Sequence, residues 1–190
     1  MSKVQFGLRN VYIAKITETT DPLTGDVTVT YATPFALPGG VNLSLSPEGD
    51  ENVFYADDSR YYVIATNAGY SGTLEIAMVT DKFAKDILGY IEDQNHLLVE
   101  SKDVQPANFA LLYEVQTDIK ARRYCFYNIT VGRADVNAAT TEESTEVQTA
   151  TLDITASAAR DTGYVKVSTT DDTPDAAYNS FFTAVPTVSL

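Results

Sequence analysis

Residues 73–89 read TLEIAMVTDKFAKDILG and hold the clearest strand pattern and the clearest helix pattern in the chain. Over residues 73–79, apolar side chains alternate with polar or small ones, so one row is expected to enter a core while the other faces outward. The predicted inward row consists of Leu74, Ile76 and Met78, and Glu75 belongs to the outward row.

A helix is predicted to follow this strand directly. Thr80 is a suitable N-cap, Asp81 suits the positive end of the helix dipole, and Gly89 suits the C-terminal end. Apolar side chains recur at helical spacing on its inner face, at Phe83, Ala84, Ile87, Leu88 and Ile91. We therefore expect the strand and the helix to pack in one core.

The rest of the chain is dominated by strand patterns arranged as hairpins. Residues 4–16 and 27–31 form the first predicted hairpin, whose turn is DPLTGD at residues 21–26, where Pro and Gly favour a reversal. The expected inward positions of its first strand are Phe6, Leu8, Val11, Ile13 and Ile16. A second hairpin is predicted to join residues 109–116 to residues 124–131.

These patterns predict a mainly β protein of about ten strands. Consecutive hairpins favour an antiparallel β-sandwich or barrel, flanked here by one α-helix, with a weaker second helix after Pro174. No repeat or composition break divides the chain, so we predict a single domain over residues 1–190. This domain is expected to carry an N-terminal arm (about residues 1–10), a long loop (about residues 46–58) and a C-terminal tail (about residues 170–190).

The chain is strongly acidic, with 26 Asp and Glu residues against 13 Lys and Arg residues and a formal net charge of -13. Proteins that grip a nucleic-acid backbone need a basic face that releases counterions, so we expect no specific binding of DNA or RNA. An acidic surface instead repels a passing polyanion.

The single cysteine and the N-terminus indicate where the chain is made. Cys125 lies in an apolar strand pattern, which predicts a buried thiol and no disulfide framework. The first residues, MSKVQFGLRN, lack an apolar leader, and no apolar run approaches the length of a membrane span. We expect a chain made in the cytoplasm, without a membrane partner.

Patterns for catalysis or ligand binding are weak. His96 is the only histidine and has no cysteine near it in the sequence, whereas a metal site needs about three or four ligands. The acidic stretch EGDEN at residues 48–52 lacks the spacing of a calcium loop. Nucleophile-elbow, phosphate-loop and dinucleotide motifs are absent from the sequence. We predict no catalytic residue, no cofactor and no metal.

Lys120, Arg122 and Arg123 form a basic cluster at the expected turn of the second hairpin. One interpretation is a solvated turn. The other is a contact with an acidic loop of a neighbouring copy, because complementary charges guide association. The sequence favours neither.

Short segments follow one another in a fixed order through most of the chain: GLRNVY (7–12), FYADD (54–58), GTLE (72–75), FAKDILG (83–89), PANFAL (106–111), TEVQT (145–149) and LDIT (152–155). This ordered set resembles the major tail protein family, the tail tube proteins of bacteriophages with long non-contractile tails. The resemblance covers about residues 7–167. It rests on the order of the segments, since no single segment is specific.

The resemblance implies a structural virion protein and not an enzyme. Members of this family form hexameric rings that stack into the tail tube. The tube would first surround a tape measure protein, would end at tail terminator and distal tail proteins, and would later conduct DNA through its lumen without specific binding. Such a protein would be assembled in the cytoplasm of the bacterial host and would reside in the virion.

Particular charged residues are expected at the surfaces that such a tube needs. Outward acidic positions on long predicted strands are expected to face the lumen: Glu75, Glu146 and Asp153. Charged residues of predicted loops and turns are expected at contacts between subunits or rings: Glu48, Asp50, Glu51, Asp57, Asp58, Lys120, Arg122 and Arg123. The N-terminal arm and the C-terminal tail are further candidates for ring contacts.

Two other functions remain open. A monomeric β-sandwich that binds carbohydrate would use tyrosines such as Tyr61, Tyr62 and Tyr70 as a stacking platform. A glycosidase would use an acidic pair such as Asp57–Asp58 or Asp171–Asp172. Adjacent residues on a strand point to opposite faces, however, and these pairs lie in predicted loops. Solvated loop charge therefore explains them better.

Overall fold

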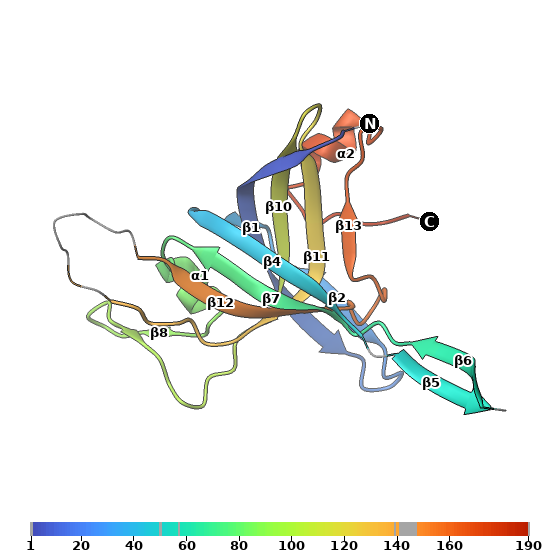
Figure 1. Cartoon of the computed structure of the whole chain (residues 1–190). Helices are drawn as coiled ribbons and strands as arrows, with labels where there is room; N and C mark the ends of the chain where they lie inside the picture. Colours follow the sequence, from blue (N-terminus) through green and yellow to red (C-terminus); the bar gives the residue numbers. More distant parts are fainter. Residues whose placement is uncertain (1, 50, 57, 139, 141–147, 190) are drawn as a thin grey trace.

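The structure is a computed structural model that describes residues 2–49, 51–56, 58–138, 140 and 148–189. Its elements in chain order are β1 (Gln5–Thr20), β2 (Val27–Tyr31), β3 (Phe35–Ala36), β4 (Gly40–Glu48), β5 (Glu51–Ala56), β6 (Ser59–Ala65), β7 (Gly69–Ile76), α1 (Asp81–Asp86), β8 (Ile91–Glu92), β9 (Leu98–Val99), β10 (Phe109–Thr117), β11 (Arg122–Val131), β12 (Ala150–Ser157), β13 (Lys166–Ser168) and α2 (Asp175–Ser180) (Figure 1). The prediction of a mainly β, antiparallel fold is confirmed. No helix in the described part of the chain is long and apolar enough to span a membrane.

One large sheet organises the chain. Its strand order is β2-β1-β10-β11-β12-β7-β4, with β3 added beside β1 and β13 beside β11, and all its pairs are antiparallel. Both β5 with β6 and β8 with β9 form small separate sheets of two strands. The two outermost strands of the large sheet, β2 and β4, both lie near the start of the chain. The pairs β1–β10 and β7–β12 join segments that are far apart in the sequence.

The large sheet folds over because two of its strands change partner along their length. The first part of β1 pairs with β10 and its last five residues pair with β2. In the same way, β11 pairs with β13 near its start and with β12 near its end. Register shifts in β1 add local bends. As a result β1, β10 and β11 form one layer, and β4, β7 and β12 form a second layer that crosses it (Figure 1).

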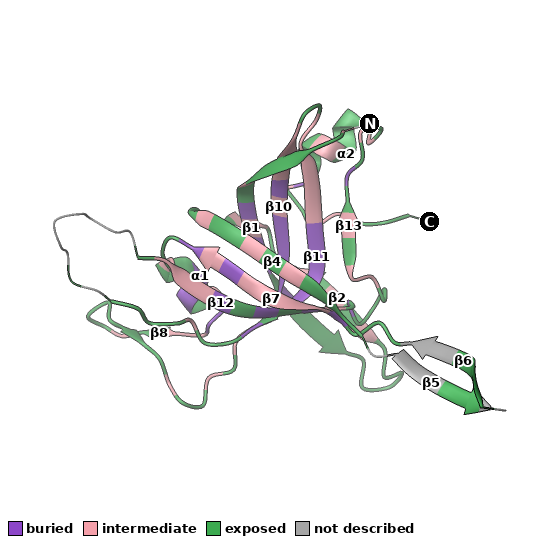
Figure 2. Cartoon of the chain, in the orientation of Figure 1, coloured by how far each residue is buried: buried purple, intermediate pink, exposed green. Residues whose placement is uncertain are grey.

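The main core lies between these two layers and against α1 (Figure 2). Its buried members are Val11, Ile13, Leu37, Leu74, Ile76, Phe83, Ile87, Leu88, Phe109, Leu111, Phe126, Ile129, Val131, Leu152, Ile154 and Ala156. The start of β4 lies tightly against β1, since a Cβ at Gly40 would stand 2.7 Å from Cγ2 of Val11. The predicted shared core of strand and helix is confirmed.

α1 begins where the sequence predicts, but its last helical residue is Asp86, ahead of the predicted stop at Gly89. The Thr80 hydroxyl accepts a hydrogen bond from the backbone N–H of Phe83 at 3.3 Å, which is the N-cap contact. Gly89 follows the helix with φ +78°, a left-handed conformation that glycine adopts without strain. The helix inserts Phe83 into the core, where its ring meets that of Phe109 edge-on at 6.0 Å.

The second face of the β1–β10–β11 layer is covered by the C-terminal segment. A separate buried cluster joins the two: Ala14, Ala110, Leu112, Cys125, Tyr127, Ala159 and Phe181. The Phe182 ring stacks on Tyr12 at 4.9 Å, and the Tyr127 hydroxyl donates to the carbonyl of Pro186 at 2.9 Å. The predicted C-terminal tail of residues 170–190 therefore contacts its own sheet as far as Pro186, and residues 187–189 are exposed.

Three side chains predicted to face the core are exposed. Met78 is 68% exposed because β7 ends at Ile76, so the alternation no longer fixes its side. Phe6 precedes a register shift of β1, and Ile91 lies beyond Gly89 in β8 instead of on the helix. In each case the prediction extends one periodic pattern beyond the residue at which the strand ends, shifts register or gives way to another element.

The segments predicted as an arm and a long loop contain strands. In the predicted arm of residues 1–10, residues 5–10 belong to β1 and lie along β10, in agreement with the strand predicted over residues 4–16. The predicted loop of residues 46–58 contains the end of β4 and all of β5, which pairs with β6 as a hairpin. Residues 53–55 are valine, phenylalanine and tyrosine, which favour strands and outweigh the acidic residues around them.

Phe83→Ala is expected to lower the free energy of unfolding by about 3–5 kcal/mol, because it removes a buried ring and leaves a cavity between the layers. The matched control, Met78→Ala, removes an exposed side chain and is expected to change stability by less than about 0.5 kcal/mol. Urea denaturation followed by far-ultraviolet circular dichroism measures both, and equal losses would contradict the placement of α1.

Candidate functional site

A polar face covers the outer side of the β4–β7–β12 layer. We call it the hydroxyl face and define it by its outward residues: Asn42, Ser44, Ser46, Ser71, Thr73, Glu75, Thr151, Asp153 and Thr155. The residues between them point the other way, so that Leu74, Ile76 and Leu152 are fully buried. Strict alternation in three adjacent strands thus makes one side core and the other side hydroxyl-rich.

The strand register makes the hydroxyl face continuous. Thr73 of β7 lies opposite Ser44 of β4 on one side and Asp153 of β12 on the other. Glu75 lies in the same way between Asn42 and Thr151. Glu75 and Asp153 are therefore diagonal neighbours, roughly 7–8 Å apart at their Cα atoms.

The hydroxyl face is acidic. Its charged members are the carboxylates of Glu75 and Asp153, and no cation belongs to it. The Glu75 carboxylate accepts a hydrogen bond from the Thr149 hydroxyl at 2.6 Å, which holds it on the face, and Asp153 is exposed. The prediction that these two residues point outward is confirmed. That they face a lumen stays a prediction, and Glu146 lies outside the described residues.

The hydroxyl face is bordered by a free strand edge. β4 ends the order of the large sheet and pairs with β7 alone among the described strands. An edge strand presents unpaired N–H and C=O groups that can pair with another chain. Features that protect an edge lie at the two ends of β4, namely the register shift between Gly40 and Asn42 and the residues Pro47 and Glu48, which leaves residues 42–46 between them. The edge is therefore suited to continue the sheet into a neighbouring chain.

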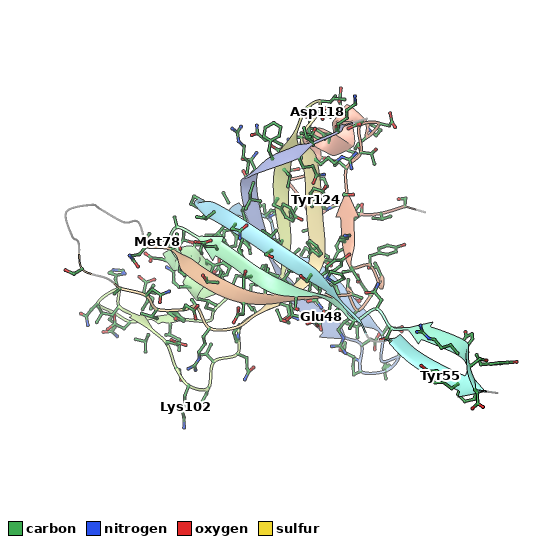
Figure 3. The ribbon with its side chains drawn as sticks, in the orientation of Figure 1. Glu48, Tyr55, Met78, Lys102, Asp118 and Tyr124 are labelled. Carbon is green, nitrogen blue, oxygen red and sulfur yellow. The ribbon has the colours of Figure 1, made fainter. Side chains whose placement is uncertain are left out.

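The β5–β6 hairpin is a second exposed surface. It projects from the end of β4, away from the two layers, and Tyr55 lies on it far from Tyr124 of β11 (Figure 3). Four aromatic side chains on it are between 62% and 70% exposed: Phe54, Tyr55, Tyr61 and Tyr62. Within the hairpin, the Phe54 ring meets the Tyr61 ring edge-on at 6.5 Å. Exposed apolar groups of this size mark interaction surfaces.

The acidic residues predicted for ring contacts lie in or beside this hairpin. Glu48 ends β4 and is exposed, and Asp58 is exposed at the turn between β5 and β6 with φ +56°. Glu51 belongs to β5, but its side chain is outside what the structure describes. Asp50 and Asp57 lie outside the described residues. Their predicted role in contacts between rings stays a prediction.

The basic cluster binds the C-terminal segment of its own chain. The Arg123 side chain is largely buried, and its Nε donates to Oε2 of Glu114 at 2.8 Å. Its guanidinium also lies 3.8 Å from the ring centroid of Tyr178. Lys120 pairs with Asp175 at 3.2 Å. The interpretation as a solvated turn is wrong for Arg123, and a contact of this cluster with a neighbouring copy stays a prediction.

Arg122 differs from its two neighbours. It begins β11, its Nε is buried without a hydrogen-bond partner among the described atoms, and its charge contributes to lowering the pKa of Asp171. The larger causes of that lowered pKa are two hydrogen bonds from Ser2, whose hydroxyl and backbone N–H donate to the carboxylate at 2.9 and 3.0 Å. Asp171 therefore ties the N-terminal segment to the C-terminal one, which disfavours its use as a catalytic acid.

Residues with catalytic potential lie apart from one another. His96 is in an exposed turn with φ +63°, and its Nδ1 lies 2.5 Å from Oε1 of Glu92. Cys125 is fully buried, and burial raises the pKa of its thiol above the ordinary value, so the thiol stays protonated. Within the described ranges, no group of three or more His, Cys, Asp or Glu side chains is placed to hold a metal ion.

The three tyrosines of the carbohydrate hypothesis are divided between two surfaces. Tyr61 and Tyr62 belong to the hairpin. Tyr70 packs at 5.4 Å against the Phe126 ring of the core and lies beneath the Lys166 ammonium at 4.6 Å. A single platform of all three is therefore not formed. No family model and no curated protein matches the chain.

Arg123→Met is expected to lower the free energy of unfolding by about 3–5 kcal/mol, because Glu114 remains buried without its partner. Arg160→Met is the matched control, since it breaks an exposed pair with Glu18 and is expected to cost about 0–1 kcal/mol. The double variant Glu114→Gln with Arg123→Met is expected to recover part of the loss in urea denaturation. Equal losses for Arg123→Met and the control would contradict the buried pair.

Proposed function

We propose that the chain is a structural virion protein that self-assembles into stacked rings, which form the tube of a long non-contractile phage tail. The observation that carries the proposal is an acidic, hydroxyl-rich sheet face beside the free edge of β4. The ordered resemblance to the major tail protein family supports it, and supplies the expectation of six copies in each ring.

The hydroxyl face has the chemistry that a DNA conduit needs. Carboxylates repel the phosphates of a passing duplex, and hydroxyl groups hold water at the wall without attracting charge. Lysine or arginine side chains on such a wall would displace the counterions of DNA and would hold the DNA by its phosphates. With Glu75 and Asp153 as its charges, this wall lets DNA pass without specific binding.

The free edge of β4 has the geometry that a ring needs. If the edge of each copy pairs with a strand of the next copy, six sheets join into one closed wall without free edges. The hydroxyl face of every copy then lies on the same side of that wall. The tape measure protein would occupy the lumen first, and tail terminator and distal tail proteins would cover the two ends of the tube.

A monomeric carbohydrate-binding module is the alternative that one observation favours. The hairpin exposes Tyr55, Tyr61 and Tyr62 together, and exposed aromatic rings can stack on sugars. Binding on a glycan array that is lost in Tyr61→Ala and Tyr62→Ala variants would support this alternative. The tube is preferred because it also accounts for the hydroxyl face and the free edge.

The purified protein is expected to form rings or tubes of uniform width with a central channel in negative-stain electron microscopy. Because a net charge of -13 makes the copies repel one another, added salt is expected to promote assembly by screening that repulsion. A species that stays strictly monomeric in analytical ultracentrifugation at high concentration, at every salt concentration, would overturn the proposal.

Reversing the charge of the hydroxyl face is expected to make assembled tubes retain DNA. The test variant carries Glu75→Lys and Asp153→Lys, and the matched control carries Asp26→Lys and Asp103→Lys, which change exposed positions elsewhere. Co-sedimentation of a short DNA duplex measures retention, which is expected to rise only in the test variant and to fall with salt. Equal retention by both variants would argue against a lumen lined by this face.

A further inference from the structure

A groove opens where the two layers of the sheet diverge. Its floor and walls are apolar side chains of five strands: Leu8, Leu43, Leu45, Tyr70, Tyr113, Val115 and Phe126. All but Phe126 are only partly buried, so the apolar core surface reaches solvent here. The exposed Lys166 ammonium stands at the rim.

Aromatic rings make up part of the lining of the groove. Tyr113 is stacked between Tyr124 at 5.2 Å and Phe126 at 6.4 Å, and Tyr70 meets Phe126 edge-on. Tyr70, Tyr113 and Phe126 line the groove, and further rings can contact them in stacked or edge-on geometry. An apolar groove with one cation at its rim suits an aromatic segment that carries a carboxylate.

The β5–β6 hairpin is such a segment. It exposes Phe54, Tyr55, Tyr61 and Tyr62, and the carboxylate of Asp58 is exposed at its turn. A hairpin of two strands is marginally stable in water unless it packs against something else. Figure 2 shows its described residues exposed, with no layer of the same chain over them.

We propose that the β5–β6 hairpin of one copy docks into the groove of a second copy, with Asp58 placed at Lys166. The hairpin projects away from the layers of its own chain, so its partner is another molecule (Figure 1). Hairpin and groove are different surfaces of one chain, so the contact is heterologous and repeats from copy to copy. This contact rests on the proposed function, to which it adds a second joint between subunits besides the edge of β4.

Site-directed disulfide formation tests the contact. Tyr62→Cys and Leu43→Cys are introduced in two separately tagged versions of the full chain, which are mixed under assembly conditions and oxidised. A disulfide between the two versions is expected. The control replaces Leu43→Cys by Leu23→Cys, at a position 94% exposed in the turn after β1, and is expected to give none. The native Cys125 is fully buried and does not compete.

A charge exchange at two exposed residues provides a second readout, and within the described part of the chain it removes the Lys166 ammonium from above the Tyr70 ring. Asp58→Lys alone and Lys166→Asp alone are each expected to reduce assembly at least tenfold in sedimentation, and the double variant is expected to restore it. Single reversals without effect, or disulfides that form equally with Leu23→Cys, would overturn the docking.

The two proposals fail in different ways. Tubes in electron microscopy without the Tyr62→Cys to Leu43→Cys disulfide would overturn the docking and leave the tail tube standing. The disulfide in a mixture that forms only dimers would support the docking and overturn the tube.

Discussion

The structure depends on the change of partner within β1 and β11. Each strand runs the full height of one layer, and each leaves its first neighbour for a second one part-way along. A sheet in which two strands change partner part-way along cannot stay flat. The strands β12, β7 and β4 therefore cross over β1, β10 and β11. The apolar core, the groove and the outer hydroxyl face all follow from that crossing.

Local features of the fold could be predicted from the sequence because their causes are local. Thr80 caps α1, the turn after β1 uses Asp21 and Gly25, and alternation places Leu74 and Ile76 inward. The change of partner within β1 could not be predicted, since its pairing with β10 joins segments separated by about half of the chain or more. One signal was present: residues 109–112 are all apolar and all buried, as in a strand covered on both faces.

In the candidate site, too, features with local causes could be predicted and features that depend on distant contacts could not. Alternation was enough to place Glu75 and Asp153 outward, but only the pairing of β7 with β12 brings them onto one face. The buried pair of Glu114 and Arg123 was missed, because the sequence pattern assigned Arg123 to the turn of the second hairpin, whereas β11 begins at Arg122 and sets Arg123 opposite Glu114. A carboxylate within an apolar strand, facing an arginine across a turn, was the signal that could have found it.

The long separation between paired strands has a consequence for how the chain folds during synthesis. Gln5 pairs with Thr117, so the central layer closes only after the ribosome has released well over half of the chain. Pairings of such high contact order form slowly. The C-terminal segment, which covers the second face of that layer, is synthesised after β10 and β11. The second face of that layer is therefore not fully covered until Phe181 has been synthesised.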